Sequence, residues 1–390
     1  MEPTKPLDEL WQPVVEAIHA SKFQTVLAAT GGSGALAALV KTPGASRTVL
    51  EAVVPYSHNS LCQWIGGTPD QACSEATARA MAMAAWMRAR ELAPEADPLK
   101  LLGLGCTASL ATNRPKRGAH RVHVAVQSGA FTRTFHLELS SSRQRVEEET
   151  LAASLVISVL AEACEASHAD LDEAMESSMG IGERISPKEQ VATRRWSELI
   201  LEDCQEMAVR APEMDPDRIP SWPKLVFPGS FNPLHSGHLR MAEVAERKLG
   251  EPLAWELAIN NVDKPPLDCL THAERIAAIH AVDRDRFVKV STLPTFVEKA
   301  EFNEEVCFVV GVDTLLRIAD PNYYASEAAT EEAIAMIEAA GCRFLVFGRV
   351  IDGKFQTLSD LTLPPTLLEL CDEVTAEEFR EDISSSELRS

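Results

Sequence analysis

Apolar positions recur with two different periods along the first 186 residues, and these periods predict interleaved helices and strands. Apolar residues three and four apart are typical of amphipathic helices, whereas short apolar or alternating runs are typical of strands. The helical segments are residues 7–21, 35–40, 74–92 and 143–165. The predicted strands are residues 23–29, 49–54, 101–106, 122–126 and 131–139, with a hairpin turning at Ser128-Gly129. Interleaved elements of both kinds predict an α/β domain.

The pattern changes between residues 187 and 223. Residues 187–210 have the spacing of a charged amphipathic helix. Residues 211–223 then carry four prolines, which cannot continue a helix and predict a stiff linker. We therefore predict a first domain over residues 1–186, a connecting helix and proline-rich linker over 187–223, and a second domain over 224–390.

From residue 224 onward, short apolar strands alternate with helices in a regular series. Residues 306–310 are apolar without interruption, as expected for a strand buried on both faces. A series of β–α units predicts a Rossmann-like, doubly wound parallel sheet, which binds ligands beyond the carboxyl ends of its strands. The predicted strands are residues 225–227, 255–259, 287–290, 306–310 and 343–347, and the helices are 239–249, 271–280 and 327–340.

Charge and cysteine content narrow the classes of partner and compartment. The formal net charge of −21 disfavours nucleic acid and anionic membranes as partners. The first residues lack the zones of a signal peptide, and the longest apolar run, 151–163, is too short to cross a bilayer. Nine cysteines without a C-x-x-C pair favour reduced thiols and show no zinc-site pattern. We expect a cytoplasmic protein; its oligomeric state stays open, a homo-oligomer included.

The strongest chemical signal lies between residues 224 and 239. A short strand, Leu225 to Phe227, leads through a Pro-Gly-Ser turn and an Asn-Pro-Leu loop into His235-Ser-Gly-His238 at the start of a helix. Such a unit aims the unpaired N–H groups of a helix N-terminus at the sheet edge. Gly237 permits close approach to the backbone, and the two imidazoles share one helix face. This combination suits a polyphosphate.

Residues 229–238 resemble the HxGH signature of the nucleotidyltransferase superfamily, which includes NMN adenylyltransferases, pantetheine-phosphate adenylyltransferases and cytidylyltransferases. The resemblance implies attack of a mononucleotide phosphate on the α-phosphorus of Mg-ATP, with release of pyrophosphate and no enzyme nucleophile. His238 would contact the α-phosphate and His235 the other side of the triphosphate. A pair of packed or surface histidines is the alternative. The nucleotide-binding residues that this resemblance implies are Gly229, Ser230, Phe231 and Gly237.

Two further loops at strand ends contribute candidates. Gly311-Val-Asp-Thr314 resembles the Gly-x-Asp loop that meets the nucleotide in adenylyltransferases, so Asp313 would hold a ribose hydroxyl or else cap the following helix. Lys264 and Arg349 lie in exit loops where a cation would meet phosphate. A solvated loop charge is the alternative for Lys264.

The C-terminal residues resemble the ISSTxxR signature of the same superfamily, here Ile383 to Arg389. The resemblance implies that Ser384, Ser385 and Ser386 bind phosphate and that Arg389 adds a catalytic cation for the β- and γ-phosphates. Ser384 with Glu387 as a capping box is the alternative.

The loop Asn261 to Leu267 resembles the Asn-x-Asp-Lys-Pro-Pro-Leu segment of divergent NMN adenylyltransferase-like proteins. On that resemblance Asn261 and Lys264 bind substrate, and the substrates are ATP, with Mg²⁺, and nicotinamide or nicotinate mononucleotide. Two alternatives stay open. One is a cytidylyltransferase acting on a phosphorylated alcohol, and the other is a non-catalytic nucleotide-binding protein.

Segments of the first domain resemble the CinA-type C-terminal domain, whose active members are NMN deamidases. They are Thr30-Gly-Gly32, Pro43-Gly-Ala-Ser46, Val54-Pro-Tyr-Ser57 and Leu102-Gly-Leu-Gly105. Ser46 and Tyr56 keep the family's serine and tyrosine, but Leu61 stands where the family has a catalytic lysine. Because a serine hydroxyl needs an adjacent base, we expect a degenerate binding or oligomerisation domain. For Ser46 the alternative is a helix N-cap, and for residues 31–34 a tight turn.

Overall fold

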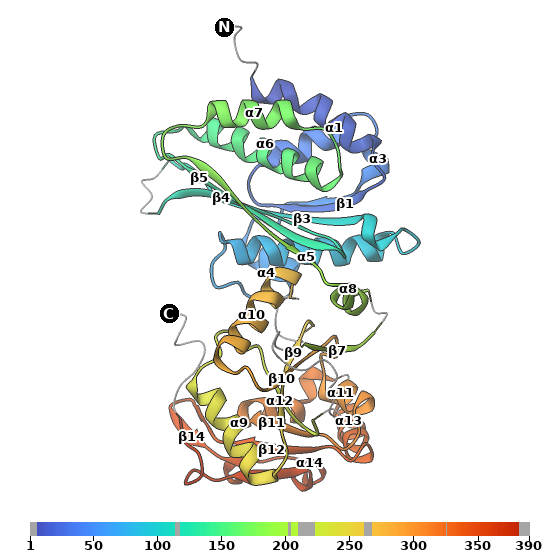
Figure 1. Cartoon of the computed structure of the whole chain (residues 1–390), viewed down its shortest axis with the longest axis vertical. Coiled ribbons are helices and arrows are strands. Elements are labelled where there is room, and N and C mark those ends of the chain that lie inside the picture. Colours follow the sequence, from blue (N-terminus) through green and yellow to red (C-terminus); the bar gives the residue numbers. More distant parts are fainter. Residues whose placement is uncertain are drawn as a thin grey trace. The chain divides into compact units, whose positions relative to one another are not determined.

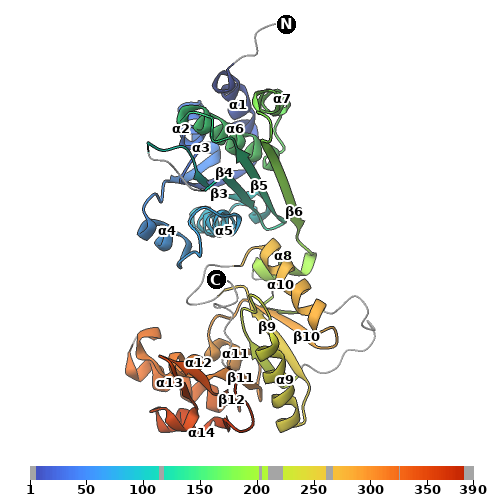
Figure 2. The ribbon, with the colours of Figure 1, turned by 90° about the vertical axis from the view of Figure 1, so that its left-hand side faces the viewer.

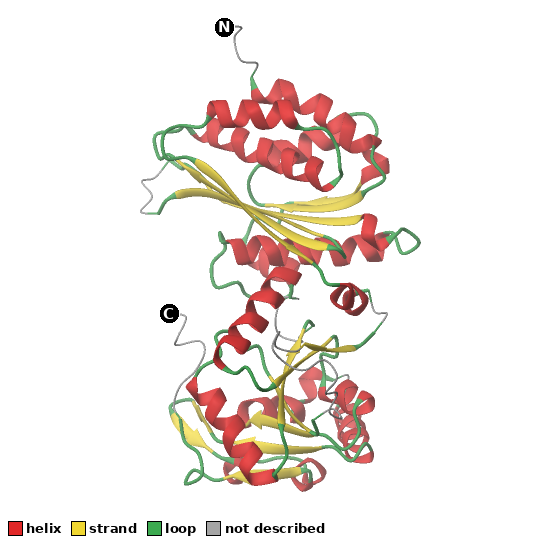
Figure 3. Cartoon of the chain, viewed as in Figure 1, coloured by secondary structure: helices red, strands yellow, loops and turns green. Residues whose placement is uncertain are grey.

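The computed structural model divides the chain into two compact units (Figure 1). The first comprises Met1–Leu201 with Asp263–Thr271, and the second Glu202–Val262 with His272–Ser390. Both contain helices and strands, in agreement with the predicted α/β class (Figure 3). The structure describes residues 6–113, 118–201, 204–209, 223–260, 267–324 and 326–381.

The first unit is built on a six-stranded mixed sheet of order β2-β1-β3-β4-β5-β6. β2, β1 and β3 are parallel, and β3 to β6 are antiparallel neighbours. Helices α1, α6 and α7 cover one face, and α4 and α5 cover the other (Figure 1, Figure 2). The strands are β1 (Gln24–Ala29), β2 (Val49–Val53), β3 (Leu101–Ser109), β4 (His120–Gln127), β5 (Phe131–Leu139) and β6 (Arg184–Val191). The helices are α1 (Trp11–Ala20), α2 (Ser33–Lys41), α3 (Ala45–Thr48), α4 (His58–Ile65), α5 (Glu75–Leu92), α6 (Arg145–Ala163), α7 (Ala169–Ser178) and α8 (Arg194–Ile200).

Helix α5 packs directly on the backbone of β3 because two glycines leave room for it. A Cβ added to Gly103 would stand 2.1 Å from the carbonyl oxygen of Ala82, and one added to Gly105 would stand 2.2 Å from that of Ala78. Both distances are far inside van der Waals contact. These two glycines therefore serve helix–sheet packing.

One carboxylate holds the start of β6 against the loop before α6. Glu183 accepts four hydrogen bonds of 2.6–2.7 Å, from the backbone N–H groups of Ser140 and Gly180 and twice from the Arg143 guanidinium. The Arg143 hydrogen bonds hold the pKa of Glu183 at about 2. The charged form is thus the one that the fold stabilises.

Replacing Glu183 with glutamine is expected to lower the free energy of unfolding of the first unit by about 2 kcal/mol at pH 7. Because the folded-state pKa is depressed, this stabilisation is present above the unfolded pKa of about 4.3 and is lost as the pH falls towards 2. Calorimetry should show the full difference between E183Q and wild type at pH 7 and roughly half of it at pH 3, because the folded-state carboxylate is still mostly ionised about one pH unit above its pKa. The exposed Glu176 provides the control E176Q. An equal loss at both pH values would contradict a charge-based role.

The second unit has a seven-stranded sheet of order β15-β12-β11-β8-β9-β10-β7. All neighbours are parallel except the edge strand β7, so the predicted doubly wound parallel sheet is present. The strands are β7 (Glu206–Val209), β8 (Leu225–Pro228), β9 (Leu253–Ala258), β10 (Phe287–Ser291), β11 (Cys307–Gly311), β12 (Arg343–Phe347) and β15 (Cys371–Val374), with a separate hairpin of β13 (Arg349–Ile351) and β14 (Lys354–Gln356). The helices that follow β7 are α9 (Ser236–Leu249), α10 (Cys269–Val282), α11 (Phe296–Phe302), α12 (Val312–Ala319), α13 (Glu327–Ala339) and α14 (Pro365–Glu369).

The core of the second unit lies between this sheet and helices α11 to α14. Val226, Phe308 and Phe344 from three adjacent strands join Leu315 of α12 and Ile334 of α13 in one buried cluster. Helix α9, which follows β8 in the chain, contacts both β8 and β9. Aligned carboxyl ends of β8, β11 and β12 place the loops after them at one edge of the sheet.

The connecting helix predicted over residues 187–210 is wrong in extent. Residues 187–191 pair with β5 as part of β6, the helix α8 spans only Arg194–Ile200, and residues 206–209 form β7. Strand pairing overrides the helical spacing here, because Glu206 of β7 forms a buried ion pair with Lys289 of β10, with 2.6 Å between Oε1 and Nζ. The division of the chain at residues 186 and 223 stays a prediction.

Candidate functional site

The turn after β8 is shaped by a glycine beneath an aromatic ring. The N–H of Gly229 donates to the carbonyl oxygen of Glu256 at 2.9 Å, which continues the β8–β9 pairing by one residue. A Cβ at Gly229 would stand 2.5 Å from the ring of Phe231. Only glycine allows the loop to fold back this closely.

Phe231 fastens that loop to the core. It has a positive φ of 40°, and its side chain is buried. Its ring makes edge-on contacts with Trp255, with 4.9 Å between ring centroids, and with His238, at 5.2 Å. Edge-on aromatic pairs of this kind hold a definite orientation. Phe231 therefore sets the position of the His238 ring as well as that of the loop.

The two signature histidines lie against each other at the first turn of α9. His235 is the N-cap residue, and its ring stacks on that of His238 with 3.7 Å between centroids. The backbone N–H of His235 donates to Nδ1 of His238 at 3.3 Å. Because Nδ1 accepts this hydrogen bond, the proton of a neutral His238 ring lies on Nε2. Nε2 can then donate to a ligand.

Both imidazoles are uncharged at neutral pH. Burial lowers the pKa of His238 to about 3, and the charges of His235 and Arg349 add to the effect. Burial also lowers the pKa of His235, against the opposing influence of Glu381. The pair therefore supplies neutral hydrogen-bond donors, while Arg349 and the helix N-terminus contribute positive charge at this edge.

Arg349 and Asp313 reach the same edge from β13 and α12. Nη1 of Arg349 donates to Oδ2 of Asp313 at 2.7 Å. Oδ1 of Asp313 is buried and has no hydrogen-bond partner among the described residues. Asp313 thus takes part in an ion pair and keeps one oxygen that a hydroxyl donor could satisfy. Since the N-cap of α12 is Gly311, Asp313 does not occupy the cap position.

Arg275 of α10 supports the loop from the other side. Its Nη1 donates to the carbonyl oxygen of Ser230 at 3.0 Å. Arg275 is not among the site residues predicted from the sequence, because an arginine on a predicted helix is typical of a solvated face. The contact ties α10 to the turn that also carries Gly229 and Phe231.

For the nucleotide transfer that the HxGH resemblance implies, replacing Arg275 with alanine is expected to lower kcat/KM by about tenfold, because a displaced loop would no longer orient the phosphate groups. R275K, which keeps a donor but not the planar fork, should retain part of the activity. Steady-state kinetics of both variants test this, with R247A in the exposed last turn of α9 as control. Activity of R275A equal to wild type would contradict the positioning role.

The structure brings part of the predicted site together. Asn261, Lys264 and the C-terminal candidates Ser384, Ser385, Ser386 and Arg389 lie outside the described residues. The predicted residues that gather at the carboxyl edge of the second sheet are Gly229, Ser230, Phe231, His235, Gly237, His238, Asp313 and Arg349.

The candidate residues of the first unit do not form a comparable site. Ser46 is exposed inside α3, whose N-cap is Gly44, so the N-cap interpretation of Ser46 is wrong. Tyr56 is 71% exposed. Neither hydroxyl has a hydrogen-bonding base beside it in the described part of the chain, and Leu61 is buried against Ile65.

The glycine loop of the first unit is closed by a carboxylate. Oε1 of Glu149 accepts hydrogen bonds from the N–H of Ser33 at 2.7 Å and from its hydroxyl at 2.9 Å. An anionic side chain thus occupies the N-terminus of α2, where a phosphate would bind. This contact favours the tight-turn interpretation of residues 31–34.

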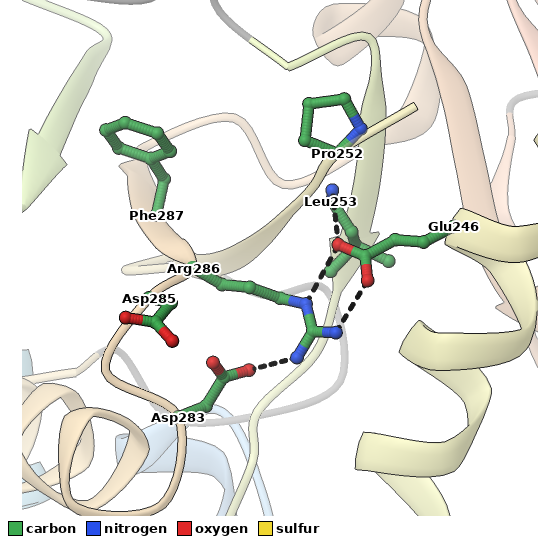
Figure 4. Close-up of a pocket in the computed structure, with 7 residues that line it drawn as sticks. All are labelled: Glu246, Pro252, Leu253, Asp283, Asp285, Arg286 and Phe287. Carbon is green, nitrogen blue, oxygen red and sulfur yellow. Dashed lines mark hydrogen bonds and ion pairs between the residues drawn. The ribbon is translucent and has the colours of Figure 1, made fainter. Parts of the chain in front are cut away.

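A hollow of about 300 Å³ lies elsewhere in the second unit, at the amino ends of β9 and β10 (Figure 4). Arg286 stands between Glu246 and Asp283, bound to both at 2.6 Å. Asp283 also accepts a hydrogen bond from the indole of Trp255. These contacts join α9 and the end of α10 to the beginnings of β9 and β10. The hollow therefore lies at the end of the strands opposite to His235 and His238.

Two further properties of the described residues bear on partners. They contain no group of three or more His, Cys, Asp or Glu side chains that could hold a metal ion. None of the described helices combines the length and apolar content that a bilayer crossing requires.

Comparison with protein families gives a match to the second half of the chain. Residues 226–390 match the family model described as Cytidylyltransferase-like. This match confirms the resemblance of that region to nucleotidyltransferases.

Curated relatives carry a more specific name. A probable nicotinate-nucleotide adenylyltransferase of Brucella suis biovar 1 is 33% identical over 100 residues, which are 25% of this chain and 48% of the relative. A protein of the same name from Agrobacterium fabrum is 39% identical over 67 residues, 17% of this chain and 36% of the relative. The chain thus spans about half or less of the curated relatives that it matches.

Comparison with solved structures finds proteins that are similar to less than half of this chain. The competence/damage inducible protein CihA of Agrobacterium tumefaciens is 18% identical, with a TM-score of 0.33, covering 42% of this chain and 99% of that one. A CinA superfamily protein of Escherichia coli is 15% identical, with a TM-score of 0.32, covering 42% of this chain and 92% of that one.

Proposed function

We propose that the second unit is an adenylyltransferase that joins nicotinate or nicotinamide mononucleotide to ATP and releases pyrophosphate. The observation that carries the proposal is the stacked, neutral pair of His235 and His238 at the first turn of α9, at the carboxyl edge of a parallel sheet. The names of the curated relatives support the pyridine nucleotide, and the family model supports the class of reaction.

The chemistry requires positioning rather than a protein nucleophile. The mononucleotide phosphate attacks the α-phosphorus of ATP, the bond between the α- and β-phosphates breaks, and pyrophosphate carries away the electron pair. Nε2–H of His238 would donate to an α-phosphate oxygen, where negative charge builds up in the transition state. Arg349 would add a cation, and Oδ1 of Asp313 would accept a hydrogen bond from a ribose hydroxyl.

Mg²⁺ would enter with the nucleotide and neutralise charge on its phosphate oxygens. Because the described residues offer no cluster of ligands, they would hold the ion mainly through the phosphates, as is common for Mg²⁺. Asn261, Lys264, the serines 384–386 and Arg389 stay proposed contacts to substrate and polyphosphate.

A cytidylyltransferase acting on a phosphorylated alcohol is the second candidate, since the matching family model is described as Cytidylyltransferase-like. The same phosphate contacts would serve CTP. For the first unit we propose binding or oligomerisation without deamidase activity, because Leu61 supplies no base. The protein would act in the cytoplasm, on small molecules rather than nucleic acid or membranes.

A substrate panel read out by pyrophosphate release tests these proposals. ATP and CTP are each combined with nicotinamide mononucleotide, nicotinate mononucleotide, phosphocholine and glycerol phosphate. We expect turnover with ATP and one of the two pyridine mononucleotides. Turnover with CTP and an alcohol phosphate alone would favour the second candidate. Ammonia release from nicotinamide mononucleotide by the full chain would overturn the assignment of the first unit.

A further inference from the structure

Carboxylates of the segment Thr375–Glu381 pair with basic residues of α9. Nζ of Lys248 in α9 donates to Oε1 of Glu378 at 2.7 Å. Nη1 of Arg240 in the same helix lies 3.6 Å from Oε1 of Glu381. The segment is anchored by Phe379, which is buried and makes an edge-on contact with Phe347 of β12, with 5.2 Å between centroids. These contacts hold the segment against the helix that carries the signature histidines.

The last described residue of this segment reaches the first turn of α9. Oε2 of Glu381 lies 3.1 Å from the point where a Cβ of Gly237 would stand, and Nδ1 of His235 lies at the same distance from that point. Both atoms are buried, and neither has a hydrogen-bond partner among the described residues. A carboxylate therefore stands beside the signature glycine and histidine without being bound by them.

The first turn of a helix is where an anion is stabilised, by unpaired N–H groups and by the helix dipole. The proposed function requires a polyphosphate at this place. A carboxylate and a phosphate repel each other when they share a site of low dielectric, so they would not occupy it together.

We propose that Glu381 is an internal anion that occupies the phosphate position at the N-terminus of α9 and leaves it when a polyphosphate binds. The inference rests on the proposed function, since it concerns the same site. It deepens that function by assigning to the chain itself a competitor for the nucleotide, which weakens the apparent affinity of the site.

The contacts of Glu381 allow such an exchange. Its partner Arg240 has a side chain that is 57% exposed, and an ion pair of 3.6 Å in that setting contributes little stability. The anchor at Phe379 and the Lys248–Glu378 pair do not involve Glu381, so its side chain can turn away while the segment stays in place. Arg240 would then also be released towards the incoming phosphate.

Binding of inorganic tripolyphosphate to the full chain, measured by titration calorimetry, tests the inference without requiring any catalysis. E381Q keeps the shape of the side chain and removes its charge. The matched control is E377Q, an exposed carboxylate of the same segment. We expect E381Q to bind about tenfold more tightly than wild type and E377Q to bind like wild type. A tenfold change corresponds to a site that the carboxylate occupies for roughly nine-tenths of the time.

A second measurement separates competition from a general change in structure. The pKa of His235, followed by NMR in the absence of ligand, should fall in E381Q because Glu381 raises it in the wild type. Equal or weaker tripolyphosphate binding by E381Q would overturn the inference. If neither wild type nor E381Q binds tripolyphosphate, both the inference and the proposed function fail. Tighter binding by E381Q without nucleotide transfer to any tested substrate would support the inference and refute only the proposed function.

Discussion

Replacing His238 with alanine is expected to lower kcat/KM for adenylyl transfer by at least about a hundredfold, equivalent to roughly 3 kcal/mol of transition-state stabilisation. The imidazole is held from two directions, by the N–H of His235 on Nδ1 and by the ring of Phe231. Its Nε2–H is thus a prepositioned donor, and alanine removes it without replacement. Since this interaction strengthens as charge develops on the phosphate, the loss should fall mainly on kcat.

The measurement is pyrophosphate release with the substrates that the panel identifies. H58A, which changes an exposed histidine of α4 in the first unit, is the control and should behave as wild type. Circular dichroism of H238A should match wild type, because a half-buried side chain at a helix start is removed without leaving a buried charge. Full activity in H238A would rule out the proposed mechanism.

Replacing Glu206 with alanine is expected to have the largest effect on stability, a loss of about 3–5 kcal/mol from the second unit. Lys289 of β10 is only 3% exposed, and Glu206 of β7 is its ion-pair partner at 2.6 Å. Removing the carboxylate takes this ion-pair partner away from a buried ammonium group, which is costly in a site of low dielectric. Asn303, which donates to the same carboxylate at 2.8 Å, loses that hydrogen bond as well and keeps the one that its side-chain amide donates to the carbonyl oxygen of Lys299 at 3.3 Å.

Urea unfolding of the full chain, followed by tryptophan fluorescence, measures this loss. E301A changes an exposed carboxylate of α11 and serves as the control. The double variant E206M/K289M should recover most of the stability, because two apolar side chains of similar length replace the pair without leaving a charge. If E206A is as stable as wild type, β7 is not an integral part of this sheet.

The pattern of apolar positions predicts several helices and strands where the structure has them. The hairpin of β4 and β5, the buried strand β11 and the long helices α5 and α6 fall where the spacing predicts them. In each of these elements the spacing of apolar residues along the chain matches the side chains that are buried. The spacing of residues 187–210 predicts one helix, but residues 187–191 pair with β5 and residues 206–209 with β10, and the helix is limited to Arg194–Ile200.

The sequence by itself determined the part of the candidate site whose residues are neighbours in the chain. His235, Gly237 and His238 lie within four residues, so a strand, a turn and a helix start suffice to bring them together. Their chemistry as donors at a helix N-terminus could be stated before any tertiary contact was known.

Only the tertiary structure decided which distant groups face them. Arg349, Arg275 and Glu381 reach this edge because of the order of strands in the sheet and the path of the chain after β15, and no local spacing encodes either. The protonation of the histidines was also undecided in the sequence, since it depends on burial and on the charge of Arg349. Periodicity records which side of an element is buried, but contact between distant elements follows from packing the whole chain.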